Sequence, residues 1–311
     1  MYAIEIEGLG KTYAANKSHK KSHTALKQVS LQIPVGSVYG LLGPNGAGKS
    51  TLINILAGIV LKSEGKVKVM GYDLDTQESK CKLSLGVVLQ ELHIDPFFTP
   101  RQILDLHAGL FGVRKKDRRT DHILSLLHLT DKANSGSQDL SGGMRRRLMV
   151  AKAMVHNPPI LILDEPTAGV DVDLRHQLWE AIRTLNAQGT TILLTTHYLE
   201  EAEAICEHIA ILNHGNIITD QPTKQLIKQF DSKILKVHLS DQQNDIPNAL
   251  TSYHVELTKK EEGGTILSIH YKPSEVSADK LLQQIVASKL SVVDIQTQEA
   301  SLEDIFLQLT R

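Results

Sequence analysis

Apolar and polar residues follow one another along the chain in patterns that predict strands and helices in turn. Tyr2 to Glu7 alternates as a half-buried strand does, and Val29 to Ile33 predicts a second strand. The polar, lysine-rich segment between them predicts an extended loop or hairpin tip. The apolar run VYGLLG then enters a glycine-rich segment, and LINILAGIV after it predicts a helix. This part of the chain is therefore expected to place a strand, a loop and a helix after a pair of strands.

The middle of the chain repeats an order of strand and helix. Lys62 to Val69 and Gly86 to Gln90 predict strands, and Arg101 to Leu129 carries apolar residues at helical spacing. Three apolar runs follow, ILILD, TILLTT and IAILN, and the first two lead into helical patterns at Leu174–Leu185 and Leu199–Ala204. Strands that alternate with helices build a parallel sheet covered on both faces. The fold class predicted for this region is therefore α/β.

The pattern changes again after Pro222. Four runs predict strands and two predict helices: strands at Ile234–Leu239, His254–Leu257, Thr265–Tyr271 and Ser291–Ile295, and helices at Ser277–Ser288 and Leu302–Leu309. This tail is expected to form a small α+β domain. The predicted domains are residues 1–228, with a helical subdomain near residues 91–155, and residues 229–311.

The composition excludes several classes of protein. The 34 Lys and Arg against 35 Asp and Glu give a net charge of −1, so no global basic field indicates a nucleic-acid partner. The apolar run Leu52–Leu61 is far shorter than the ~20 residues that cross a bilayer, and the N-terminal alternation predicts a strand instead of a signal peptide. Cys81 and Cys206 show no metal-ligand spacing, and we interpret both as small buried residues in a reducing cytosol.

A glycine-rich segment predicts a phosphate site. Its sequence GPNGAGKST comprises Gly43, Pro44, Asn45, Gly46, Ala47, Gly48, Lys49, Ser50 and Thr51. It fits the pattern G-x-x-x-x-G-K-[ST], whose glycines let backbone N–H groups surround the β-phosphate while Lys49 reaches the β- and γ-oxygens and Ser50 reaches Mg²⁺. A glycine-rich turn is the alternative, but it does not explain Lys49 at that place. Because a strand precedes the loop and a helix follows it, we predict nucleotide binding.

A second motif, ILILDE, ends an apolar run with two carboxylates. A buried parallel strand delivers its last residues to the crevice where ligands bind, so Asp164 is expected in the Mg²⁺ shell and Glu165 at the γ-phosphate. A general base needs a carboxylate within hydrogen-bond reach of the attacking water, and Glu165 is the candidate. The alternative is an exposed acidic turn before Pro166.

A third motif, LSGGMRRRL, predicts the start of a helix. Exposed backbone N–H groups and the helix dipole favour an anion beside Ser141, Gly142 and Gly143. On its own, however, the same stretch is a helix N-cap followed by glycines. The basic run at residues 145–147 is interpreted as solvated or ion-paired.

Five ordered motifs together resemble those of the ATP-binding-cassette ATPases. They are Gly43–Thr51, Gln90 after an apolar strand, LSGGM at Leu140–Met144, LILDEPTAGVD at Leu161–Asp171, and TTH ending at His197. The resemblance covers about the first 225 residues. It implies a phosphate-loop ATPase domain with a mixed-sheet core and a helical subdomain, which binds ATP and Mg²⁺ and hydrolyses ATP to ADP and phosphate.

The resemblance also implies why one chain carries two anion motifs. In ATP-binding cassettes, LSGGM caps the γ-phosphate of the ATP held by a second, antiparallel subunit. The implied assembly is a head-to-tail homodimer with two sandwiched nucleotides. In it, Ser141, Gly142 and Gly143 complete the partner's site.

Single positions take their expected roles from the same family. Tyr13 resembles the aromatic residue that stacks on adenine, with core packing or an ordinary loop position as the alternative. Gln90 resembles the residue that touches Mg²⁺ and the attacking water and senses the membrane partner, and it is otherwise an exposed polar side chain. His197 resembles the histidine that contacts the γ-phosphate, and it is otherwise a cap or a packed ring. Asp171 fits the loop that crosses the dimer interface. The implied Mg²⁺ ligands are Ser50, Gln90 and Asp164.

Three further segments resemble those of bacterial exporter ATPases for drugs, lipids and polysaccharides, including the YadG-type group. They are DEPTAGVD, TTHYLEEAE and the closing SLEDIFLQLTR. This resemblance implies a subunit on the cytoplasmic face of the membrane that powers a separately encoded permease. The alternative is a soluble assembly or regulatory ATPase without a permease, and no active-site residue distinguishes the two.

The acidic residues Glu200, Glu201 and Glu203 suit the start of a helix and need no functional role.

Overall fold

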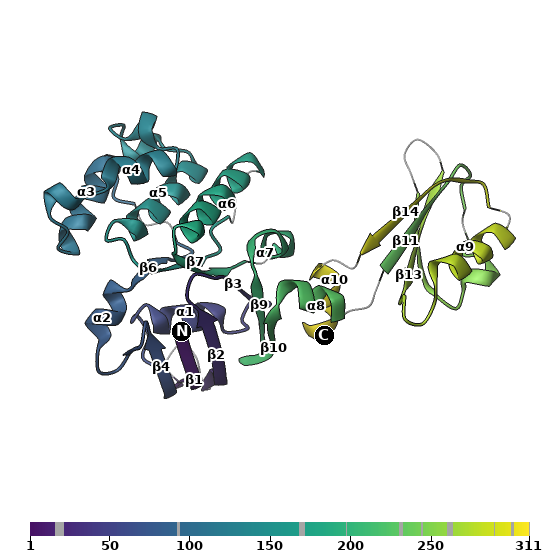
Figure 1. The fold of residues 1–311 in the computed structure, drawn as a ribbon, viewed down its shortest axis with the longest axis horizontal. Helices are drawn as coiled ribbons and strands as arrows, with labels where there is room; N and C mark the ends of the chain where they lie inside the picture. The colour runs from purple at the N-terminus through teal and green to yellow at the C-terminus, as the bar shows by residue number, and fades with distance from the viewer. Residues whose placement is uncertain are drawn as a thin grey trace. The chain divides into compact units, whose positions relative to one another are not determined.

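The computed structural model describes residues 1–15, 22–91, 94–167, 172–196, 198–229, 233–243, 245–259, 264–288, 290–299 and 302–310 (Figure 1). The chain folds into two compact units, an N-terminal unit of Met1–Thr223 and a C-terminal unit that begins at Lys224 and extends to Leu309. Within the described ranges, no helix combines the length and the apolar character needed to cross a membrane.

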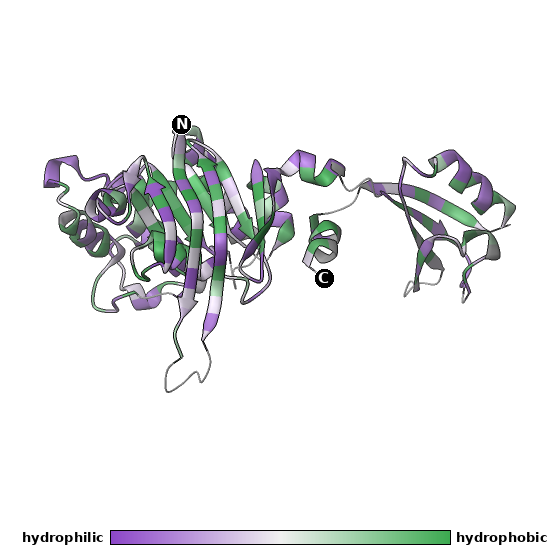
Figure 2. Ribbon diagram, turned by 90° about the horizontal axis from the view of Figure 1, so that it is seen from below, coloured by the Kyte–Doolittle hydropathy of each residue, from purple (hydrophilic) through white to green (hydrophobic). Residues whose placement is uncertain are grey.

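The N-terminal unit begins with an antiparallel sheet in the order β2-β1-β4-β5. Its strands are β1 (Tyr2–Tyr13), β2 (His23–Pro34), β4 (Glu64–Val69) and β5 (Tyr72–Asp73). The expected loop between the first two strands is shorter than predicted, because Tyr13 still pairs with His23 and Thr12 with Thr24. Polar cross-strand pairs can extend a hairpin, as the Thr12 and Thr24 hydroxyls do at 3.1 Å. Figure 2 shows the alternation of apolar and polar residues along these long strands.

A second, mixed sheet has the order β10-β9-β3-β8-β7-β6. Its strands are β3 (Val38–Leu42), β6 (Leu85–Val88), β7 (Ile160–Asp164), β8 (Thr191–Thr195), β9 (His208–Asn213) and β10 (Asn216–Pro222). The strands β3, β6, β7, β8 and β9 run parallel, which confirms the parallel sheet predicted from the alternating strands and helices. The edge strand β10 is antiparallel and was not predicted, because it lacks a buried apolar face and forms by pairing with β9.

Seven α-helices lie within the described part of the N-terminal unit. They are α1 (Lys49–Leu56), α2 (Glu78–Leu83), α3 (Pro100–Leu110), α4 (Thr120–Leu126), α5 (Gly142–Met154), α6 (Val172–Ala187) and α7 (Leu199–Ile205). Helix α1 stops sooner than the apolar run LINILAGIV suggested, because Gly58 takes a φ of +70° and ends it. Thr99 and Gln102 form a capping box that fixes the start of α3. Helices α3, α4 and α5 lie together on the side of the unit opposite β1, β2 and β4 (Figure 1).

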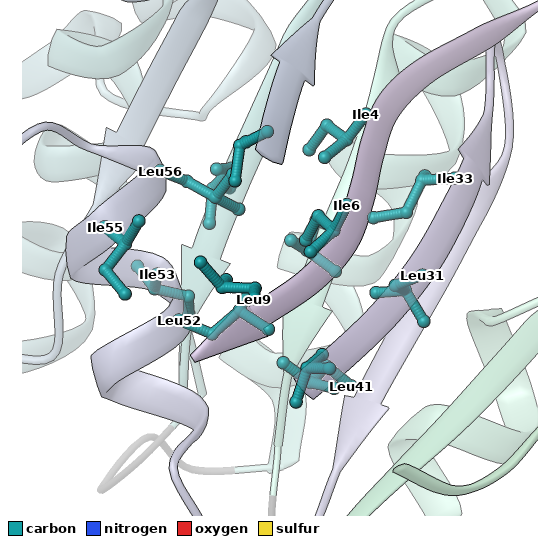
Figure 3. Packing of buried hydrophobic residues seen from close by; sticks show 14 of the residues in the cluster. Ile4, Ile6, Leu9, Leu31, Ile33, Leu41, Leu52, Ile53, Ile55 and Leu56 are labelled. Atoms are coloured by element: carbon teal, nitrogen blue, oxygen red, sulfur yellow. The ribbon is translucent and has the colours of Figure 1, made fainter. Parts of the chain in front are cut away.

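The main hydrophobic core lies between α1 and the two sheets. Figure 3 shows its centre, where apolar side chains of β1, β2, β3 and α1 interdigitate: Ile4, Ile6, Leu9, Leu31, Ile33, Leu41, Leu52, Ile53, Ile55 and Leu56. Cys81 belongs to the same core and Cys206 is also buried, so the interpretation of both cysteines as buried residues is confirmed. This packing anchors the strand before the phosphate loop and the helix after it.

The C-terminal unit is built on a four-stranded antiparallel sheet in the order β12-β13-β11-β14. Its elements are α8 (Thr223–Gln229), β11 (Lys233–Leu239), β12 (His254–Lys259), β13 (Thr265–Tyr271), α9 (Ala278–Ala287), β14 (Val292–Glu299) and α10 (Leu302–Thr310). Leu281 and Ile285 of α9 pack on the buried face of the sheet. The predicted α+β tail is confirmed, with α8 as an additional helix.

Candidate functional site

The phosphate loop joins β3 to α1, and close packing requires two of its glycines. A Cβ atom on Gly43 would lie 2.2 Å from the carbonyl oxygen of Leu212. A Cβ atom on Gly48 would lie 2.6 Å from the carbonyl oxygen of Ala25, and Gly48 has a φ of +114°. Only glycine satisfies both demands. The sequence therefore folds into a tight loop that presents backbone N–H groups at the start of α1.

Lys49 lies over this loop. Its Nζ donates hydrogen bonds to the carbonyl oxygens of Gly43 at 2.6 Å and Pro44 at 3.2 Å. The side chain is only 7% exposed. Burial lowers the pKa of Lys49, and the nearby carboxylates of Glu165 and Asp164 oppose that shift. The site thus holds a largely desolvated cationic group next to two acidic groups.

The two carboxylates at the end of β7 have different surroundings. Asp164 is buried and accepts a hydrogen bond from the Thr195 hydroxyl. Glu165 has a φ of +49°, a conformation that costs a residue with a side chain about 1–3 kcal/mol. Its backbone N–H donates to the carbonyl oxygen of Thr195 at 3.1 Å, and its Oε2 accepts from Gln90 Nε2 at 3.1 Å. The strained turn separates a buried acid from one that is partly exposed to solvent.

A cleft of about 580 Å³ gathers most of the predicted site residues. Its lining includes Tyr13, Asn45, Gly46, Ala47, Gly48, Lys49, Ser50, Thr51, Gln90 and Glu165. Sequence reasoning missed His23, which also lines the cleft because it pairs with Tyr13 across β1 and β2. Only the strand register, which a sequence does not display, places His23 there.

Tyr13 stands at the edge of this cleft. Its side chain is 38% exposed, so the alternative of core packing is wrong. Its hydroxyl lies 3.5 Å from the Thr51 hydroxyl, and Lys11 Nζ lies 4.8 Å from the centre of its ring. An exposed aromatic ring held in this way offers a flat surface for a nucleobase.

The LSGGM motif lies away from the cleft of its own chain. Ser141 caps α5 by accepting a hydrogen bond from the Met144 N–H at 3.3 Å. Gly142 is exposed, and a Cβ atom there would meet nothing within 4 Å. Neither these two residues nor Gly143 line the cleft. Packing within the described chain therefore does not require a glycine at Gly142.

Two predicted residues, Asp171 and His197, lie outside the described residues. Their roles stay predictions.

Arg146 is buried, so the solvated alternative of the sequence interpretation is wrong for this residue. Its side chain is 3% exposed, so it is not solvated. The guanidinium group donates to five backbone carbonyl oxygens, those of Leu89, Gln90, Asp164, Glu165 and Pro166. Arg147 is also buried and donates to Leu127 O and Gln177 Oε1, each at 3.1 Å, whereas Arg145 is exposed. The Arg146 hydrogen bonds therefore hold α5 against the segments that carry Gln90 and Glu165.

Arg146→Lys is expected to destabilise the protein by about 3 kcal/mol, because an ammonium group cannot reach all five carbonyl oxygens and leaves several of them buried and unpaired. Denaturant titration followed by circular dichroism measures this change. Arg145→Lys, one residue earlier on the same helix, is the control and should change stability by less than about 0.5 kcal/mol. Equal stabilities of the two variants would contradict the role of Arg146.

Glu201 also has a structural role that the acidic run did not reveal. Its carboxylate is fully buried and accepts hydrogen bonds from the Thr167 hydroxyl at 3.0 Å and from Trp179 Nε1 at 2.8 Å. It ties α7 and α6 to the segment that follows Glu165. The sequence interpretation assigned the run no functional role, and the structure adds this packing role for Glu201 alone among the three.

A separate apolar groove of about 450 Å³ lies beside the cleft. We call it the α3–α5 groove, and its lining includes Ile59, Leu89, Phe111, Met149 and His156. The rings of Phe111 and His156 stack with their centres 3.9 Å apart. Leu89 lines this groove and its neighbour Gln90 lines the cleft. The groove and the cleft therefore meet at the segment that follows β6.

Comparisons with known proteins agree on both units. The family model for ABC transporters matches residues 26–168, and the model for the C-terminal domain of DrrA1-3-like ATP-binding proteins matches residues 222–310. The chain is 32% identical to the Nod factor export ATP-binding protein I of Ralstonia nicotianae, over 99% of this chain and 93% of that protein. It is also 32% identical to the linearmycin resistance ATP-binding protein LnrL of Bacillus subtilis, over 99% of this chain and 98% of that protein.

Solved structures are similar over somewhat less than three quarters of the chain. A dimeric ATP-binding cassette in a post-hydrolysis state, with ADP and phosphate bound, has a TM-score of 0.62 and 26% identity, covering 71% of this chain and 98% of that one. The ATP-binding subunit of an ABC transporter has a TM-score of 0.65 and 28% identity, covering 73% of this chain and 93% of that one.

Proposed function

Because this chain belongs to the ABC transporter family as the ATP-hydrolysing subunit of an exporter, we propose that its 580 Å³ cleft holds ATP with Mg²⁺ and that hydrolysis there drives a separate permease. The observation that carries the proposal is the meeting of Lys49, Gln90 and Glu165 in one cleft with the phosphate loop. Backbone N–H groups and Lys49 hold the phosphates. Tyr13 provides a surface for the adenine.

The residues around Lys49 fit a magnesium ion. Mg²⁺ prefers oxygen ligands and is usually held by one or two protein groups together with phosphate oxygens. Ser50 offers an exposed position at the start of α1, Asp164 a buried carboxylate and Gln90 an amide oxygen. When bound, the ion supplies charge neutralisation at the transferring phosphoryl group.

Glu165 acts as the general base in this proposal. It lines the cleft that holds the phosphate loop, and its carboxylate accepts a hydrogen bond from Gln90 Nε2. A carboxylate in that position accepts the proton of the attacking water. Lys49 stabilises the charge that develops on the phosphoryl oxygens.

The exposed residues Ser141 and Gly142 of the LSGGM motif support a head-to-tail homodimer. Ser141 and Gly142 present the N-terminus of a 13-residue helix to solvent and do not line their own chain's cleft. A second copy in the opposite orientation gives this helix end a phosphate to cap. The similar post-hydrolysis cassette is dimeric, which supports the same arrangement here. Asp171 and His197 retain their proposed places at the interface and at the γ-phosphate.

The α3–α5 groove is proposed as the seat of a cytoplasmic helix of the permease, which holds the chain at the cytoplasmic face of the membrane. Among the apolar residues that line it, Ile59 is 60% exposed and Phe111 is 36% exposed, so the groove offers apolar surface to an occupant. Arg146 donates to the carbonyl oxygens of Leu89 and Gln90 and to that of Glu165. Movement of an occupant against Leu89 is therefore transmitted to the catalytic carboxylate.

Capture from native membranes tests the transporter function. The Glu165→Gln chain with ATP and Mg²⁺ is expected to retain a polytopic membrane protein in stoichiometric amount from detergent-solubilised membranes, identified by mass spectrometry. Adding Ile59→Glu should reduce this recovery at least tenfold, because a charge in the α3–α5 groove must be desolvated on docking. The Ile59→Glu chain should hydrolyse ATP normally. Recovery of soluble proteins alone would favour an assembly or regulatory ATPase instead.

A further inference from the structure

Three side chains with metal-binding atoms meet on the sheet of the C-terminal unit, far in sequence from the ATPase motifs. His254 of β12 pairs directly with His270 of β13, and Glu256 follows His254 by two residues. Side chains two residues apart on a strand share a face, so all three lie on one face of the sheet. The alternate residues of β13, Leu267 and Ile269, belong to the core under α9. The cluster therefore occupies the face that α9 does not cover.

The distances within the cluster approach those of a metal site. His254 Nε2 lies 3.3 Å from Glu256 Oε1, and His270 Nε2 lies 3.9 Å from the same oxygen. The three candidate ligand atoms all lie within 4.8 Å of one another. Ligand atoms about 2.1 Å from a tetrahedral metal ion are about 3.4 Å apart. Side-chain rotations that shorten the longer separations toward this value would bring the three atoms onto one ion.

His270 supplies the observation that points to a ligand. Its Nε2 atom is buried and has no hydrogen-bond partner among the described residues. A buried polar nitrogen without a partner is costly, so such an atom calls for an explanation. The side chain of His254 is 72% exposed, which leaves a route from solvent to the cluster. An ion that enters there would satisfy His270 Nε2 and hold β12 to β13.

We propose that His254, Glu256 and His270 form a binding site for a divalent transition metal ion of the Zn²⁺ class. Two imidazoles and one carboxylate are ligands that Zn²⁺ accepts, and Mg²⁺, which prefers an all-oxygen shell, is not expected to compete. Three protein ligands leave a coordination position for water or another donor. The ion stabilises the C-terminal unit because it binds the folded pairing of the two strands.

Metal titration of the full chain tests this site. The nucleotide-free chain, freed of any polyhistidine tag and treated with chelator, is titrated with Zn²⁺ in a calorimeter and with Co²⁺ in a spectrophotometer. One equivalent of Zn²⁺ is expected to bind, to raise the melting temperature and to persist in millimolar Mg²⁺. Co²⁺ should give the visible absorption of a four- or five-coordinate ion.

The variants separate this site from weak binding by other histidines. His254→Ala changes an exposed side chain and should leave folding intact, yet weaken Zn²⁺ binding at least tenfold. Glu256→Gln should weaken it similarly, and His254→Ala with His270→Ala should abolish both the Zn²⁺-dependent rise in melting temperature and the Co²⁺ spectrum. His122→Ala, which removes an exposed histidine from α4, is the matched control and should bind as the unmodified chain does. Equal Zn²⁺ affinity of the His254→Ala and His122→Ala chains overturns the proposal.

Discussion

Glu165→Gln is expected to lower steady-state ATP hydrolysis at least about 100-fold while ATP still binds. Glutamine has nearly the same shape as glutamate, so the contact with Gln90 and the turn at φ +49° are retained. The amide, however, cannot take a proton from the attacking water. The loss should therefore fall on kcat, with little change in the affinity for ATP.

Phosphate release and equilibrium binding of ATP measure the two effects separately. Glu200→Gln is the control, because Glu200 is an exposed carboxylate on α7 and its loss should leave turnover unchanged. The Glu165→Gln chain should also accumulate as a dimer when ATP and Mg²⁺ are present at micromolar protein concentration, as light scattering detects. Turnover at the rate of the unmodified chain would exclude Glu165 as the base.

Lys49→Ala is expected to weaken ATP binding at least about 100-fold, because it removes the buried charge over the phosphate loop and its charge-assisted hydrogen bonds to phosphate oxygens. The ammonium group donates to the carbonyl oxygens of Gly43 and Pro44, which places it at the centre of the loop. Lys49→Arg should fail as well, since a planar guanidinium does not fit the space of a compact ammonium group.

Fluorescent-nucleotide titration measures the affinity of the Lys49 variants. Lys66→Ala removes an exposed lysine from β4 and is the control, with unchanged affinity expected. The melting temperatures of the Lys49→Ala and Lys49→Arg chains should stay close to that of the unmodified chain, so that lost binding cannot be assigned to unfolding. Unchanged ATP affinity of a folded Lys49→Ala chain would contradict the assignment of the cleft.

The features that the sequence predicted well are local. The phosphate loop is written in consecutive residues, and the close approach of Gly43 to Leu212 O and of Gly48 to Ala25 O explains why its glycines are required. The parallel strands were predicted because burial on both faces makes each one a continuous apolar run. The tail could likewise be predicted from alternating strands and an amphipathic helix.

The features that the sequence concealed depend on partners far along the chain. Arg146 binds backbone carbonyl oxygens at positions up to 57 residues away. Every residue has a backbone carbonyl group, so the sequence does not show which of them accept these hydrogen bonds. Glu201 differs from its acidic neighbours only because α7 turns it toward Trp179 and Thr167. The pairing of His254 with His270 depends on the register between β12 and β13. In each case, packing selects one residue from a run of similar ones.

The hydrogen bond between Trp179 and Glu201 gives the protein an optical reporter of its own. The chain contains a single tryptophan, so all of its indole emission comes from one site. The same carboxylate that accepts from the indole also binds Thr167, two residues beyond Glu165. We expect any rearrangement of that segment during the ATPase cycle to alter the polarity around the indole ring. Stopped-flow fluorescence of the unlabelled chain can therefore follow the cycle in real time.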